Sequence, residues 1–94
     1  MSGLSILNEF CLAASTDTRI THLHICVYMA LFQYWHLNGF QNPVQVSRRQ
    51  IMLAAKVKRT TYHKCIKDLH NYGYIEYLPS YHPLLGSAVY MQVK

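Results

Sequence analysis

The stretch SRRQIMLAAKVKRTTYHKCIKDLHNYGYI, residues 47–75, decides the fold of this chain. Lys and Arg residues alternate in it with Ile, Leu, Ala and Tyr, and Asp68 is its only acidic residue. The four residues SRRQ at 47–50 have the form of a capping box, in which Ser and Gln satisfy the free N–H groups at a helix start. An apolar run follows, so the sequence predicts a short helix that ends near Lys56.

A second helix is predicted from about Arg59 to Gly73, because glycine suits the left-handed position that follows a helix. Its apolar stripe has helical spacing and consists of Tyr62, Cys65, Ile66, Leu69 and Tyr72. Its opposite face consists of Arg59, Thr60, His63, Lys64 and Lys67. Two short helices joined by about three residues make a helix-turn-helix. The cations interleave with core residues because the two sets occupy opposite faces, and we expect the cations to converge into one convex ridge.

A longer helix is predicted before this pair, from about Arg19 to Leu37. Asp17 or Thr18 can cap its first N–H groups, and Gly39 suits the position after its end. Its apolar stripe is predicted to consist of Ile20, Leu23, Val27, Ala30, Leu31 and Tyr34. At this length the helix can brace a small domain.

The N-terminal residues LSILNEFCLAAS at 4–15 predict a short amphipathic helix. Its apolar positions at helical spacing are Leu4, Leu7, Phe10, Cys11 and Ala14. A chain of 94 residues has the size of one domain. We therefore divide it into an N-terminal extension or short helix at residues 1–17 and a single domain at residues 18–94.

Three further segments have the patterns of strands. NPVQV at 42–46 is at best a short edge strand, because Pro43 has no N–H group to donate to a ladder. YIEYL at 74–78 and AVYMQV at 88–93 alternate in polarity, and the Pro and Gly residues between them favour a turn. The predicted fold is therefore α+β, mainly α: a three-helix winged helix-turn-helix with a C-terminal β-hairpin wing.

Residues 47–77 resemble winged-helix regulators. The shared pattern is a capped helix with Ile51 and Ala54, then Val57, a Thr at 60 or 61, and Ile66, Leu69, Gly73 and Ile75 in register. The segment PSYHPLLGSAVYM at 79–91 is similar to small winged-helix proteins of bacterial conjugative elements and transposons. The resemblance implies that the helix after Arg59 enters the DNA major groove, and that the hairpin reaches adjacent backbone or minor groove. The chain departs from the pattern at Lys58, where many relatives have a small capping residue, and at the wing tip, which has no Arg or Lys.

The distribution of charge favours a polyanionic partner. The net charge is +5, and of the nine Lys and Arg residues only Arg19 precedes Val46. Phosphate contacts are assigned to Arg48, Arg49, Lys56 and Lys67, and contacts in the groove to Arg59, Thr60, His63 and Lys64. Lys58 and Thr61 complete the predicted site at the start of the helix. At the wing, the predicted donors to phosphate are Ser80, Tyr81 and His82.

Other chemistry has little support in the sequence. The chain has neither paired carboxylates nor a Ser/His/Asp arrangement nor a phosphate-cradling Gly loop, so no enzyme is predicted. His22 and Cys26 share a helix face but His24 lies on another, so a partly buried, hydrogen-bonded histidine is favoured over a metal site, and no cofactor or metal is expected. The three cysteines lack C-x-x-C spacing, and the start lacks a basic signal region. These absences predict a cytoplasmic protein without a membrane span.

The predicted function is sequence-specific binding of double-stranded DNA. The protein would regulate transcription, or would assist the excision or replication of a bacterial mobile element. The alternative is a winged-helix module for protein–protein interaction, which the uncharged wing and the eight tyrosines favour. RNA binding is a weaker third reading, because no sheet motif for base stacking is visible. A homodimer that uses the apolar N-terminal segment remains open.

Overall fold

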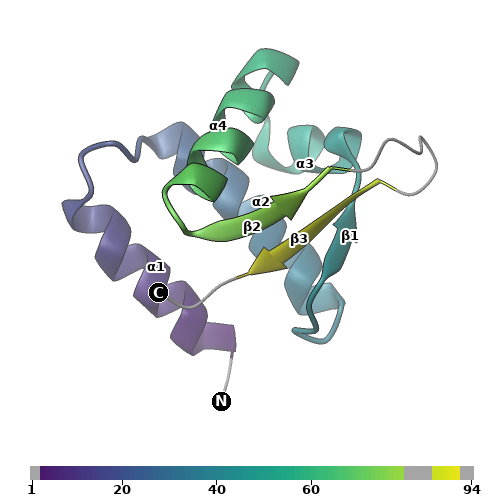
Figure 1. The fold of residues 1–94 in the computed structure, drawn as a ribbon, viewed down its shortest axis with the longest axis horizontal. Helices are drawn as coiled ribbons and strands as arrows, with labels where there is room; N and C mark the ends of the chain where they lie inside the picture. Colours follow the sequence, from purple (N-terminus) through teal and green to yellow (C-terminus); the bar gives the residue numbers. More distant parts are fainter. Residues whose placement is uncertain (1–2, 80–85, 92–94) are drawn as a thin grey trace.

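The computed structural model describes residues 3–79 and 86–91 (Figure 1). In these residues the protein is α+β and mainly helical, with four helices and one three-stranded antiparallel sheet. The elements in chain order are α1 (Gly3–Thr16), α2 (His22–Leu37), β1 (Val44–Val46), α3 (Arg48–Ala55), α4 (Arg59–Asn71), β2 (Ile75–Leu78) and β3 (Ser87–Met91). Figure 1 shows α4 lying across one end of the β2–β3 pair, with α1 far from β1.

The sheet has the strand order β1-β3-β2. The strand β3 pairs with β2 through Ile75 opposite Met91, and with β1 through Val44 opposite Val89. The predicted edge position of β1 and the predicted pairing of the last two strands are both confirmed. Val44, Val46 and Val89 are buried, so the sheet turns its apolar face toward the helices.

The start of α3 confirms the predicted capping box. The Ser47 hydroxyl accepts from the Gln50 backbone N–H at 3.1 Å, and the Gln50 side chain accepts from the Ser47 N–H at 2.9 Å. The helix ends at Lys56, which takes a left-handed conformation with φ of 58°. Two residues later α4 begins after Lys58, whose side chain makes no capping bond, and Gly73 follows its end with φ of 87°.

The predicted start of α2 at Arg19 is wrong by three residues. The helix begins at His22 after Thr21, and the His24 ring closes its first turn by accepting from the Thr21 backbone N–H at 3.0 Å. Asp17 does not cap this helix, because its carboxylate accepts from the Arg19 side chain at 2.9 Å and from the Tyr74 hydroxyl at 2.7 Å. The Arg19 guanidinium and then the Tyr74 hydroxyl hold the pKa of Asp17 well below its usual range.

The buried face of α2 is also rotated from the predicted stripe. Val27, Ala30 and Leu31 are buried as predicted, but Leu23 is 37% exposed. Buried residues of α2 outside the predicted stripe are His24, Tyr28 and Trp35. Tyr28 is covered by Phe10 of α1, and His24 meets Asp68 of α4, so contacts with both helices extend the buried face.

The helix α1 packs its own apolar residues into the core. Ile6 and Phe10 are buried, and the Phe10 ring stacks on Tyr28 with centroids 3.6 Å apart and meets Tyr74 edge-on at 5.3 Å. The predicted stripe of this helix is partly wrong: Leu4 is 71% exposed and Cys11 is exposed, whereas Ile6 was not in the stripe. The prediction holds for Phe10, which meets Tyr28, and for Leu7 and Ala14, which are half-buried against the core.

Gly86, just before β3, lies close to the backbone of Val46 at the end of β1, and a second glycine with a left-handed backbone allows this close contact to be tested. A Cβ atom at Gly86, where φ is 67°, would lie 2.7 Å from the Val46 carbonyl oxygen, whereas a Cβ atom at Gly39, where φ is 66°, would meet nothing within 4 Å. We expect Gly39→Ala to lower the free energy of unfolding by about 1–2 kcal/mol from backbone strain alone. Gly86→Ala should lower it by about 1–3 kcal/mol more, because backbone atoms must move apart. Urea denaturation measures both, and equal losses would contradict the close approach.

Candidate nucleic-acid interface

The structure places the predicted DNA-contacting residues on α3, on the turn after it and on α4. The side chains of Arg48, Arg49, Lys56, Lys58, Arg59, Thr60, His63, Lys64 and Lys67 are exposed, and Thr61 is half-buried. Ser80, Tyr81 and His82, the predicted wing contacts, lie outside the described residues. The exposed set is therefore reachable by a large ligand, and its arrangement decides which ligand fits.

The outward side of α4 brings together Thr60, His63, Lys64, Lys67 and Asn71, which we call the outer face of α4. These residues recur at spacings of three and four, so they project from the same side of the helix. The opposite side holds Tyr62, Cys65, Ile66 and Leu69, all at most 2% exposed. The predicted stripe is confirmed in these four residues, whereas Tyr72 is only half-buried. Burial raises the pKa of the Cys65 thiol, as expected for a core cysteine.

Lys64 on the outer face is not a free cation. Its ammonium donates to the Asp68 carboxylate at 2.8 Å, and the same carboxylate oxygen lies 2.8 Å from Nε2 of His24 on α2. His24 is 3% exposed, so the prediction of a hydrogen-bonded histidine in the interior is confirmed. Lys64 first and His24 second lower the pKa of Asp68. The carboxylate therefore stays ionised, steadies Lys64 on the surface and links α4 to α2.

A hollow of about 240 Å³ lies between α4 and β2. His63 and Lys67 line it from the outer face of α4, together with His70 and Tyr77. Nδ1 of His70 accepts from the Tyr77 backbone N–H at 3.0 Å, which fixes the imidazole against the strand. The sequence reasoning missed His70. Its position seven residues after His63 and three after Lys67 was a signal that could have found it.

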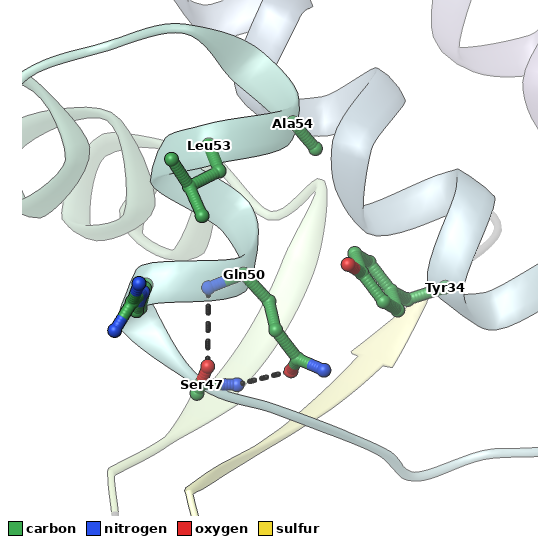
Figure 2. A pocket seen from close by; sticks show the side chains of 6 residues that line it. Tyr34, Ser47, Gln50, Leu53 and Ala54 are labelled. Atoms are coloured by element: carbon green, nitrogen blue, oxygen red, sulfur yellow. Dashed lines mark hydrogen bonds between the residues drawn. The ribbon is translucent and has the colours of Figure 1, made fainter.

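Two of the predicted phosphate contacts line hollows between α2 and α3. Arg49 lines a hollow with Tyr34 of α2, and Lys56 lines a neighbouring hollow with Ile25 and Met29 of α2. Figure 2 shows the first of these hollows, with Tyr34 facing Gln50 and Ala54 of α3. The cations thus do not form the single convex ridge that we expected from the sequence. One group follows the outer face of α4, and Arg49 and Lys56 lie beside α2.

Arg48 and Arg59 add exposed positive charge at the first positions of α3 and α4. Burial raises the pKa of the Tyr62 phenol on α4, and the positive charge of Arg48 acts in the opposite direction.

Comparisons with known proteins do not assign the chain to a family: no family model, curated protein or solved structure matched it. Within residues 3–79 and 86–91, no helix combines the length and the apolar character needed to cross a bilayer. In the same part of the chain, no three His, Cys, Asp or Glu side chains gather closely enough to hold a metal ion. Any functional conclusion therefore depends on the surfaces described above.

Proposed function

We propose that this protein binds double-stranded DNA in a sequence-specific way as a winged helix-turn-helix protein. The observation that carries the proposal is the outer face of α4, where exposed cations, a threonine and a histidine project from a helix whose other side is anchored in the core. The capped α3 before it and the β2–β3 pair after it support the same reading. A regulator of transcription, or an accessory of mobile-element excision or replication, would use such a surface.

In this proposal α4 lies in the major groove. Arg59 and Lys64 can donate to O6 and N7 of guanine, and the Thr60 methyl group can contact a thymine methyl group. Lys67 and Arg48 contact phosphates on either side and so supply affinity rather than sequence choice. His63 and His70 lie toward β2, where the backbone of the duplex would pass between helix and hairpin. Arg49 and Lys56 are left out of this set because they lie beside α2.

The proposal predicts strong salt dependence of binding to duplex DNA. The logarithm of the affinity should fall linearly with the logarithm of salt concentration, with a slope of about 0.9 per phosphate contacted. Lys67→Gln should reduce this slope by about 0.9, because one phosphate contact is lost. Arg49→Gln is the matched control and should leave the slope unchanged. Fluorescence anisotropy with a labelled duplex measures both variants, and an absent or salt-independent interaction of the unaltered protein would refute the proposal.

The preference for particular base pairs is tested by a second experiment. Duplexes would be selected from a random pool by the unaltered protein and by Arg59→Ala and Lys64→Ala. Each variant should lose discrimination at the base pair that its side chain contacts, by about 1–3 kcal/mol. If both variants recovered the same motif as the unaltered protein, the assignment of these side chains to base edges would be wrong.

A second candidate function is protein binding. Apolar side chains of α2 and α3, among them Ile25, Met29 and Leu53, are exposed on the surface that Arg49 and Lys56 flank. This observation does not compete with the outer face of α4, because the two surfaces use different residues. The salt titration separates the functions, since only the first requires duplex DNA.

A further inference from the structure

A furrow runs between α2 and α3. It consists of two adjoining hollows of about 470 and 410 Å³, and Ala54 of α3 lines both of them. Ile25 and Met29 of α2 line the larger hollow, and Tyr34 of α2 and Leu53 of α3 line the smaller one. Figure 2 shows Ala54 and Gln50 on the α3 side of the smaller hollow and Tyr34 on the α2 side.

The furrow presents apolar surface that residues 3–79 and 86–91 leave exposed. Ile25 and Met29 are each 41% exposed, and Leu53 is 66% exposed. Scattered single apolar residues on a surface are ordinary, but here they line two hollows that share Ala54. The small side chain of Ala54 leaves room in it, so an apolar side chain of a ligand can enter.

The charges at the furrow have one sign. The 16 residues of α2 include no Asp, Glu, Lys or Arg. Arg49 lines the smaller hollow and Lys56 the larger one, and neither hollow is lined by a carboxylate in the part of the chain that the structure describes. An occupant that complements the furrow is therefore apolar along its middle and negatively charged at both ends.

The length of the furrow matches a helix. Its α2 side extends from Ile25 to Tyr34, which are nine helical rises apart, or about 14 Å at about 1.5 Å per residue. An amphipathic helix that places apolar residues at positions i, i+4 and i+7 covers a similar length in a groove. We propose that the furrow binds an acidic amphipathic helix of a partner protein, with apolar side chains in the two hollows and carboxylates facing Arg49 and Lys56.

A second copy of this chain fits the furrow less well. A two-fold contact of this surface with itself would bring the Arg49 and Lys56 side chains of both copies together, and each copy carries a net charge of +5. Like charges across an interface oppose association. A separate acidic helix meets the same cations with attraction instead of repulsion.

The test uses the full chain and a displayed library of 15-residue helical peptides. Each peptide has Leu at three positions spaced i, i+4 and i+7, with Glu, Gln or Lys at the flanking positions. We expect peptides with Glu to be enriched at least about tenfold over matched peptides with Lys. Amide shifts of the labelled protein, titrated with the most enriched peptide, should change at Ile25, Met29 and Ala54. No enrichment, a preference for Lys, or shift changes confined to other residues would refute the proposal.

Variants sharpen the result. Ala54→Glu places a carboxylate in both hollows at an exposed helical position, so we expect it to abolish peptide binding while circular dichroism stays unchanged. Leu12→Glu is the matched control, because Leu12 is 64% exposed on α1 and lines neither hollow. Arg49→Glu with Lys56→Glu should reverse the preference from Glu peptides to Lys peptides. Undiminished binding by Ala54→Glu, or an unchanged preference in the double variant, would contradict the assignment.

Sedimentation equilibrium decides between the partner helix and a second copy. A dimer that Ala54→Glu dissociates would assign the furrow to self-association and overturn the proposal, whereas a monomer agrees with it. Peptide binding is measured without duplex DNA, and DNA binding without peptide. The failure of one proposal therefore leaves the other standing.

Discussion

Phe10→Ala is expected to lower the free energy of unfolding by about 3–5 kcal/mol, the range found when a buried aromatic ring is removed from a core. Phe10 is 4% exposed and lies between two aromatic rings, stacked on Tyr28 and edge-on to Tyr74. Loss of the Phe10 ring would leave a cavity between α1, Tyr28 of α2 and Tyr74, the residue before β2. Small domains have only about 5–15 kcal/mol in total, so the variant should unfold at much lower urea concentration.

Leu12→Ala is the control for this prediction. Leu12 is on the same helix but is 64% exposed, so its truncation should change stability by no more than about 0.5 kcal/mol. The comparison separates packing of α1 on the core from any general effect on helix formation. Equal, small effects of the two variants would mean that α1 is a dispensable extension rather than part of the folded domain.

Asp68→Ala is expected to cost about 1–3 kcal/mol, because Nε2–H of the buried His24 would lose its acceptor. Nδ1 of His24 accepts from the Thr21 backbone N–H, so in the neutral ring the proton is on Nε2 and points at Asp68. Asp68→Asn keeps an oxygen that can accept this bond and should cost less. Urea denaturation of both variants at pH 7 measures the difference, and an equal loss would mean that the His24 bond contributes nothing.

The same carboxylate gives the stability a dependence on pH. Lys64 and His24 lower the pKa of Asp68 in the folded protein, so the ionised group adds stability above the unfolded pKa, near 3.9. This contribution is lost as the pH falls through the lower pKa of the folded state. The gap in unfolding free energy between the unaltered protein and Asp68→Asn should therefore be present at pH 7 and shrink below about pH 4. Glu9→Gln, at an exposed position, is the control, and a gap that grows in acid would contradict the ion pair.

Local patterns were sufficient to predict α3, α4 and the glycines that follow α2 and α4. A capping box and a left-handed glycine act over four residues, so neighbours in sequence determine them. The start of α2 could not be predicted in this way. Asp17 is a good capping residue by type, but Tyr74, 57 residues away, binds its carboxylate together with Arg19. The exposure of Leu4 and Cys11 on α1 has the same kind of cause, because Tyr28 and Tyr74 decide which side of the helix is buried.

The candidate site shows a similar limit. Spacing correctly predicted that Thr60, His63, Lys64 and Lys67 face away from the core. It did not reveal which neighbour an outward side chain meets. Arg49 and Lys56 proved to lie beside α2, and Lys64 proved to be paired with Asp68. Such facts depend on how the helices pack, and a helical period does not contain that information.

The imidazole of His24 connects the first turn of α2 to the surface of α4 through hydrogen bonds at both of its ring nitrogens. One ring nitrogen defines where α2 begins, and the other holds the carboxylate that orients Lys64. A substitution at Thr21, which is not itself a proposed nucleic-acid contact, would then alter how a lysine is presented to its ligand. Evolution or engineering could therefore tune recognition at Thr21 without changing any side chain of the proposed DNA-contacting set.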